Sequence, residues 1–166
     1  MNNRLKSAGL GTVEHPSETI QVVSFRLHQV LYALDIRHVQ EIIKVVPVTP
    51  VPHTPSWVAG VINLRGQIMP LLDLALLLHL RSKPSPGSER FVILRGTQYA
   101  LALMVDTVHE VLRLPLQQLE TSPVTTLHKD YIQAICRHQE QCVIVLDVAK
   151  IMQERCIPTV PHEEVV

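Results

Sequence analysis

The stretch that decides the expected fold begins at Gly60 and reads Gly-Val-Ile-Asn-Leu-Arg-Gly-Gln-Ile-Met-Pro-Leu-Leu-Asp-Leu. Two short apolar runs, residues 61–64 and 68–72, flank Arg65 and Gly66. Glycine supplies the positive φ that tight reversals often need, so the pattern predicts a β-hairpin. Arg65 is expected at or beside the tip, where its guanidinium can present a fixed fork of donors to a partner.

Two features of this stretch have more than one interpretation. Asp73 stands where the second strand is expected to stop, so its carboxylate is predicted to cap a short helix over residues 74–80. An arginine beside a turn glycine is also typical of plain solvated surface, because turns favour polar residues. The hairpin alone therefore leaves the role of Arg65 open.

Composition excludes several classes of protein. The 166 residues are 46% hydrophobic and 18% charged, enough apolar content to fold and too much for a disordered tail. Lysine plus arginine and aspartate plus glutamate number 15 each, so no basic excess favours nucleic acid or an anionic membrane surface. Residues 1–18 are polar and lack the apolar segment of a signal peptide, and residues 68–80 are too short to span a bilayer. A cytoplasmic location without direct membrane insertion is expected.

The cysteines do not indicate a disulfide framework or a metal site. There are three, an odd number, which fits free thiols in a reducing compartment. His138 lies between Cys136 and Cys142, but the paired CxxC spacing of zinc sites is missing. Because Cys142 begins an apolar run, we expect its thiol to be buried and inert.

The order of segments predicts two β-rich units. Residues 1–18 are expected to form a flexible tail, residues 19–80 a first unit and residues 90–152 a second. Proline and serine mark residues 81–89 as a linker, and residues 153–166 form a C-terminal tail.

A separate cluster of prolines interrupts the first unit. Residues 47–55 contain four prolines and cannot form a central strand, because proline has no N–H to donate. They are expected to form a stiff extended loop that holds Trp57 as a partly buried anchor.

The second unit repeats the first. Val108-His-Glu-Val-Leu112 echoes Val39-Gln-Glu-Ile-Ile43 at an offset of 69 residues, and Asp147-Val-Ala-Lys-Ile151 echoes Asp73-Leu-Ala-Leu-Leu77 at an offset of 74. Each unit carries about five short strands and one short helix. The expected fold is therefore mainly β: two linked five-stranded SH3-like β-barrels with a few short helices.

Several of these segments resemble the CheW family, the coupling proteins of bacterial chemotaxis. The stretch from Gly60 meets every fixed position of the family pattern Gly-Val-x-Asn-Leu-Arg-Gly-x-Ile-x-Pro-x-x-Asp-Leu. Val39-Gln-Glu-Ile42 matches the family's Val-x-Glu-Ile segment, and residues 105–112 match another. The resemblance covers residues 19–152 and implies that they form one CheW-like domain.

The resemblance also implies a function and a site. Such a chain would be a non-enzymatic adaptor that couples the cytoplasmic tips of chemoreceptors, which are helical hairpins, to the regulatory domain of a CheA-type histidine autokinase. It would lie in the cytoplasm, at the inner face of the membrane through receptor arrays. Partner contacts would cluster at positions matching Val39, Glu41, Ile42, Gly60, Asn63 and Arg65. From the residues alone, a solvated carboxylate at a strand edge is the favoured interpretation of Glu41.

No catalytic constellation is recognisable in the sequence. No serine lies in a GxSxG context, no glycine-rich phosphate loop precedes a helix, and no metal-ligand spacing occurs. We therefore expect no catalytic residue, no bound metal and no cofactor. Two alternatives remain open: an adaptor of the same fold in another chemosensory-type pathway, such as type IV pili or gene regulation, and a small-ligand-binding or enzymatic β-barrel.

Overall fold

The computed structural model describes residues 17–80, 87–121, 129–154 and 157–158. The expected N-terminal tail, apart from residues 17 and 18, lies outside the described residues, as do residues 81–86 of the expected linker and most of the C-terminal tail. No helix within the described ranges is both long enough and apolar enough to cross a membrane.

Ten strands, two short α-helices and three 3-10 turns make up the described chain. The first half contains β1 (Thr19–Leu27), β2 (Val30–Asp35), η1 (Ile36–His38), β3 (Val39–Lys44), β4 (Val58–Leu64), β5 (Gln67–Asp73) and α1 (Leu74–Leu77). The second half contains β6 (Arg90–Leu94), β7 (Leu101–Val105), β8 (Thr107–Pro115), η2 (Leu116–Gln118), η3 (Lys129–Tyr131), β9 (Ile132–His138), β10 (Gln141–Leu146) and α2 (Val148–Met152). The mainly β fold expected from the sequence is confirmed.

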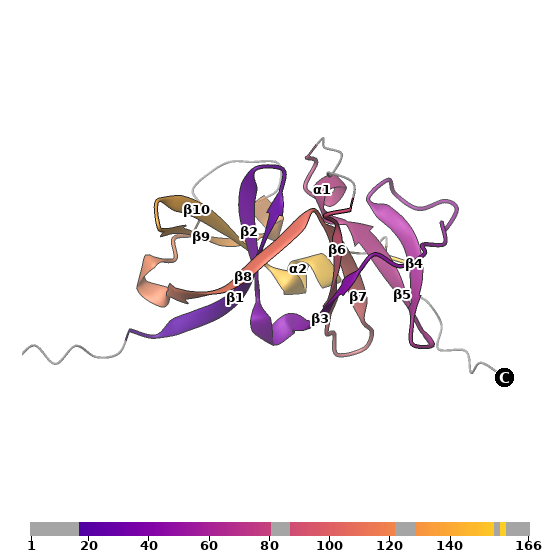
Figure 1. Ribbon diagram of the computed structural model, residues 1–166, viewed down its shortest axis with the longest axis horizontal. Helices are drawn as coiled ribbons and strands as arrows, with labels where there is room; N and C mark the ends of the chain where they lie inside the picture. The colour runs from indigo at the N-terminus through magenta and orange to yellow at the C-terminus, as the bar shows by residue number, and fades with distance from the viewer. Residues whose placement is uncertain (1–16, 81–86, 122–128, 155–156, 159–166) are drawn as a thin grey trace, which may run out of the picture.

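The strands form two five-stranded sheets that lie side by side, as Figure 1 shows. One has the order β8-β1-β2-β10-β9 and is called the β1 barrel below; the other has the order β3-β6-β7-β5-β4 and is called the β3 barrel. In each, all neighbours are antiparallel except one parallel pair, β2 with β10 and β5 with β7.

Each sheet is closed by the chain that follows one of its edge strands. Thr49, beyond β3, exchanges two backbone hydrogen bonds with Val61 of β4, both of 2.9 Å. Glu120, beyond β8, does the same with Ile135 of β9, at 2.9 and 2.8 Å. Because closure pairs the outer strands, neither sheet leaves two long edges exposed.

The predicted boundary between the barrels is wrong. Residues 19–80 and 90–152 do not form one barrel each, because β1 and β2 pair with β8 and β10 whereas β3, β4 and β5 form their sheet with β6 and β7. The chain leaves the β1 barrel through η1, completes the β3 barrel, and returns at β8. Each barrel is therefore assembled from both halves of the sequence.

The internal repeat is nevertheless visible in detail. The carboxylates of Asp73 and Asp147, 74 residues apart, cap α1 and α2, each accepting a bond of 3.1 Å from the backbone N–H three residues later. Strands β3 and β8 each carry a register shift at the same place, opposite β6 and β1 respectively. The repeat therefore places the same elements at equivalent positions in the two barrels.

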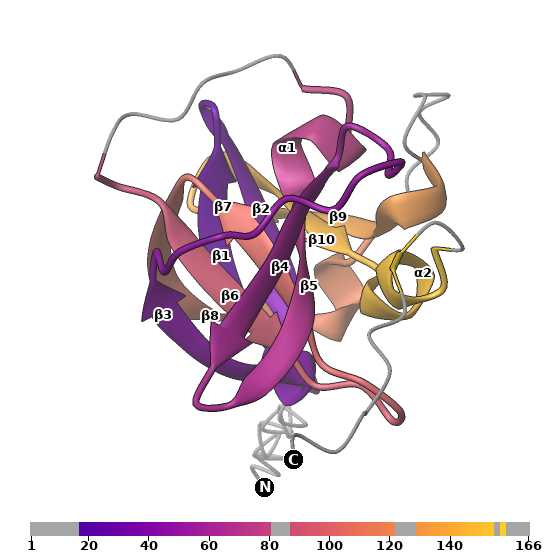
Figure 2. The same ribbon diagram turned by 90° about the vertical axis from the view of Figure 1, so that its right-hand side faces the viewer.

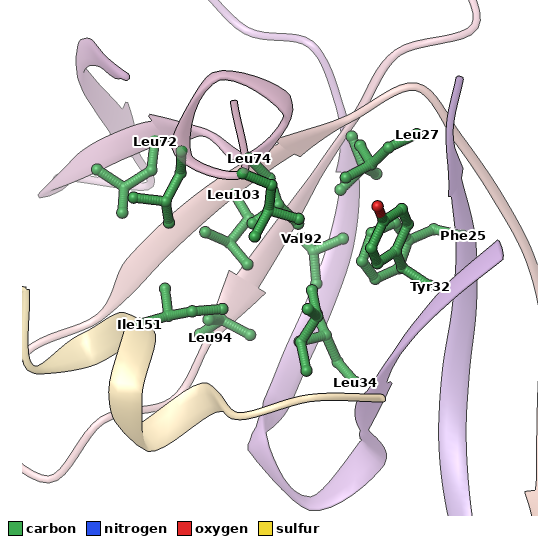
Figure 3. Close-up of a cluster of buried hydrophobic side chains, with 14 of the residues drawn as sticks. Phe25, Leu27, Tyr32, Leu34, Leu72, Leu74, Val92, Leu94, Leu103 and Ile151 are labelled. Carbon is green, nitrogen blue, oxygen red and sulfur yellow. The ribbon is translucent and has the colours of Figure 1, made fainter. Parts of the chain in front are cut away.

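Three apolar clusters hold the fold together. One fills the inside of each barrel. The largest lies between the barrels, where Phe25 and Tyr32 from one sheet meet Val92 and Leu103 from the other, and Ile151 of α2 packs against them (Figure 3). Because this shared core draws on both sheets, the barrels form a single domain, which positions their outer faces relative to each other.

Candidate interaction surface

The predicted hairpin is formed by β4 and β5 and ends in a two-residue turn. Leu64 pairs with Gln67, so Arg65 and Gly66 are the two turn residues, with φ of 51° and 84°. Positive φ at both positions is typical of a type I′ turn, whose twist matches that of paired strands. The Asn63 side chain secures the turn by accepting a hydrogen bond of 2.9 Å from the N–H of Gly66. Arg65 is therefore held at the tip, as expected.

The structure brings Arg65 together with Glu41, which lies 24 residues earlier in the sequence. The two guanidinium Nη atoms donate to the two carboxylate oxygens at 2.7 and 2.9 Å, a bidentate ion pair. Figure 2 shows the hairpin of β4 and β5 in front, with β3 beside it. The strands β3 and β4 are the two outer strands of the sheet, so barrel closure is what makes this contact possible.

This ion pair fixes geometry more than it adds stability. The Arg65 side chain is 71% exposed and that of Glu41 is 24% exposed. The hydrogen bonds from Arg65 lower the pKa of Glu41, so the carboxylate stays ionised. Exposed pairs contribute little to folding, but a bidentate fork holds both side chains in one orientation. The solvated-carboxylate interpretation of Glu41 is therefore replaced by that of a charged partner that orients Arg65.

Strand β3 presents an apolar side chain next to this pair. Ile42 is 39% exposed, and its cross-strand neighbour Val92 belongs to the core between the barrels. Val39 is only partly buried and packs against the same core. The exposed face of Ile42 therefore continues the apolar layer that joins the barrels.

Gly60 serves the site through its backbone. It is buried with φ of +148°, and a Cβ placed there would lie 2.3 Å from the carbonyl oxygen of Thr49. Only glycine allows Thr49 to reach Val61 and close the barrel, which in turn brings β3 next to the hairpin. Its visible contribution is to position Glu41 and Arg65, and any partner contact by Gly60 itself remains a prediction.

Sequence reasoning missed one exposed residue of this hairpin. Ile68 of β5 is 46% exposed and is the cross-strand neighbour of Asn63. Its exposure follows from the alternation of side chains along a strand: Met69 points into the barrel, so the preceding residue, Ile68, points outward. Asn63 and Ile68 thus share the outer face of the hairpin just behind Arg65.

The expectations for the cysteines and for Trp57 are resolved differently. Cys142 is exposed, so the prediction that it is buried is wrong; Cys136 is the buried thiol. The two lie one pair apart on β10 and β9, where alternation turns Val143 and Cys136 inward and Cys142 outward. Trp57 is partly buried against the core between the barrels, as expected.

Among the described residues, no cluster of three potential metal ligands is present.

Residues 21–156 match the family described as the CheW-like domain. The chain belongs to the CheW family. The match spans both barrels. It includes all residues of the Arg65–Glu41 surface, which are Val39, Glu41, Ile42, Gly60, Asn63, Arg65 and Ile68.

Relatives agree with this assignment along most of their length. The chain is 32% identical to the chemotaxis protein CheW of Treponema pallidum, over 83% of this chain and 85% of that protein. It is 31% identical to the chemotaxis protein CheW of Klebsiella aerogenes, over 87% and 90%. A crystal structure of the scaffolding protein TtCheW from Thermoanaerobacter tengcongensis superimposes with a TM-score of 0.74 at 32% identity, covering 83% of this chain and 90% of that one. As a member of the CheW family, the chain is a scaffold protein of chemotaxis signalling.

Proposed function

We propose that this CheW-family protein is a non-enzymatic adaptor that couples the cytoplasmic tips of chemoreceptors to the regulatory domain of a CheA-type histidine kinase. The observation that supports this most is the bidentate Arg65–Glu41 pair, which fixes an exposed guanidinium at the tip of a rigid hairpin. Both Nη atoms already bond to Glu41, yet the side chain remains largely exposed, so a partner carboxylate or carbonyl can reach the remaining N–H groups.

The kinase contact is assigned to the end of the β3 barrel around Arg65. A regulatory domain with the same barrel fold would meet this end in a pseudo-symmetric arrangement. Asn63 and Ile68, on the outer face of the hairpin, would flank the arginine with one polar and one apolar group. Such an anchor, a charged group flanked by one polar and one apolar side chain, gives specificity through its donors and affinity through burial.

The receptor contact is assigned to the exposed side of β3. Ile42 borders the core between the barrels, so an apolar stripe on a receptor helix would extend that core instead of starting a new one. This is the helix-in-groove type of recognition, in which aliphatic side chains spaced along one helix face provide the contact. Val39, on the same strand, packs against that core.

Charge reversal at Arg65 tests the kinase contact. In the Arg65→Glu variant, binding of the kinase regulatory domain should weaken by on the order of a hundredfold, because a donor fork is replaced by a carboxylate. Binding can be measured by isothermal calorimetry against the purified domain. Arg137→Glu, a reversal at an exposed arginine of the β1 barrel, is the matched control and should bind as the parent does.

A double variant separates direct contact from internal positioning. Glu41→Arg combined with Arg65→Glu restores an ion pair of reversed polarity. If the partner contacts the guanidinium of Arg65, the double variant should bind as weakly as Arg65→Glu alone. Parent-like kinase and receptor binding by Arg65→Glu would remove this residue from the site.

The receptor surface is tested separately. Ile42→Asp should reduce capture by receptor-containing membranes while kinase binding is retained, because Ile42 and Glu41 are successive residues of β3 and point to opposite faces of the strand. Loss of both interactions, with folding intact by circular dichroism, would contradict the division into two surfaces.

Chemotaxis is favoured over another chemosensory-type pathway, because the relatives named above are chemotaxis proteins. The cytoplasm is the proposed location, at the inner face of the membrane where receptor tips lie. The pathway can be tested by deleting the gene and scoring swimming in soft agar together with pilus-dependent twitching. A twitching defect without a swimming defect would favour the pilus pathway.

A further inference from the structure

The β1 barrel contains an incomplete counterpart of the Arg65–Glu41 pair. At the repeat offsets of 69 and 74, Glu110 corresponds to Glu41 and Gln139 to Arg65. The turn between β9 and β10 has the same geometry as the first, since His138 pairs with Gln141 and the two turn residues have φ of 47° and 65°. The tip is therefore in place, but its side chain is a neutral amide.

Glu110 lies at the same irregularity of its strand as its counterpart Glu41. The shared register shift lies at this position, and the Ser24 hydroxyl donates to the carbonyl of Glu110 at 2.7 Å. Ser24 is 1% exposed, so this anchor is inside the barrel. The Glu110 carboxylate takes part in neither of the ion pairs found among the described residues. The backbone of Glu110 is thus anchored at the equivalent place, and its carboxylate has no arginine partner among these ion pairs.

A cavity of about 220 Å³ lies beside this carboxylate. Its buried lining includes Ser24, Leu31 and Leu112, and its exposed lining includes Glu110 and Gln139. The volume is below the roughly 300 to 1,000 Å³ of pockets for drug-sized ligands, so it suits one side chain. Leu31 and Leu112 can contact the methylene groups of a long side chain, and the carboxylate of Glu110 can bind its charged end.

We propose that this cavity, the β1 mouth, binds an arginine side chain supplied by a partner protein. The β3 barrel shows what completes the arrangement, because there the fork is supplied from within the chain. The occupant is assigned to a different protein, since this chain's own hairpin arginine is already paired with Glu41. The proposal is independent of the Arg65 surface, which lies on the other barrel.

Other charged and titratable groups also line the cavity. Arg26 also lines it, but its Nη1 donates to the carbonyl of Gln29 at 2.8 Å, in the turn between β1 and β2. His109 and His138 also line it. Glu110 is the one carboxylate among the lining residues, so it is the group with which an incoming guanidinium would pair, against the opposing charge of Arg26.

The test uses N-acetylarginine methylamide as the probe, titrated into the full-length protein and followed by two-dimensional amide NMR. We expect saturable shifts confined to the strands around the β1 mouth, and at least fivefold weaker binding of the lysine analogue, which lacks a planar fork. Glu110→Gln should weaken probe binding at least tenfold. Glu140→Gln is the matched control, because it removes an exposed carboxylate that does not line the cavity, and it should bind as the parent does.

A second variant keeps the test decisive. Gln139→Arg places an arginine where the repeat has Arg65, so an internal pair with Glu110 should form and probe binding should fall below detection while the thermal midpoint is kept. Undiminished binding in both variants, or shifts only around Arg65, would overturn the proposal. Self-association abolished by either Glu110→Gln or Arg65→Gln would overturn the assignment to a different protein, because it would indicate a second copy as the source.

Discussion

Replacement of Gly60 by alanine tests how the β3 barrel is closed. The added Cβ would lie 2.3 Å from the carbonyl oxygen and 2.8 Å from the carbonyl carbon of Thr49, and both are backbone atoms that no rotamer change can move away. Strain at the positive φ contributes about 1 to 3 kcal/mol. Displacement of Thr49 breaks its two hydrogen bonds to Val61, which adds about 1 to 3 kcal/mol. The free energy of unfolding should therefore fall by roughly 2 to 6 kcal/mol.

Urea unfolding measures this loss, and the fluorescence of Trp57, the chain's one tryptophan, reports on the transition next to β4. Gly66→Ala is the matched control. Gly66 also has positive φ, but a Cβ there would meet no atom within 4 Å, so only backbone strain of about 1 to 2 kcal/mol is expected. If Gly60→Ala loses no more stability than Gly66→Ala, the close approach of Thr49 is not what requires glycine, and the argument that Gly60 positions the Arg65–Glu41 surface fails.

Three further predictions concern the helix cap, the strand exchange and the exposed thiol. Burial raises the pKa of Asp73, so the folded state disfavours its ionised form. Asp73→Asn keeps the helix cap and should gain stability relative to the parent as pH rises through the raised pKa. Asp73→Ala removes the cap and should lower the free energy of unfolding by about 1 kcal/mol in urea titrations at neutral pH. A parallel pH profile for Asp73→Asn and the parent would contradict the sign. Fragments 1–83 and 84–166 should each lack a cooperative unfolding transition by circular dichroism and should regain one when they are mixed, because each barrel needs strands from both fragments. A stable barrel formed by either fragment alone would refute the exchange of strands between the two halves of the chain. In a Cys156→Ser background, a maleimide should modify the exposed Cys142 in the folded protein and should modify Cys136 only after unfolding, as measured by mass spectrometry. Equal rates of modification would contradict the opposite orientation of the two thiols.

Local patterns in the sequence predicted the elements well. The Arg65-Gly66 turn, the capping role of Asp73 and the repeat of β3 in β8 follow from residue types and spacing within a few positions. These are short-range properties, set by backbone preferences and by hydrogen bonds to near neighbours. They survive in the folded chain because the tertiary structure does not oppose them.

The membership of the barrels could not be predicted in the same way. In a duplicated chain, β3 can complete a sheet with its own half or with the other half, and both arrangements contain the same set of strand contacts. In the structure the chain passes from one barrel to the other through η1, and the residue pattern does not indicate that crossing. The Glu41–Arg65 pair was also hidden, because it forms only when the outer strands β3 and β4 meet on closure.

The exchange of strands has a consequence for how such a chain could arise. One repeat on its own, from β1 to α1, supplies two strands to one sheet and three to the other, so a single copy cannot finish either. Two separate copies could finish both as a symmetric homodimer. Tandem fusion of such a dimer would allow the two hairpin turns to differ, as they do in this chain, where Arg65 stands at one and Gln139 at the other.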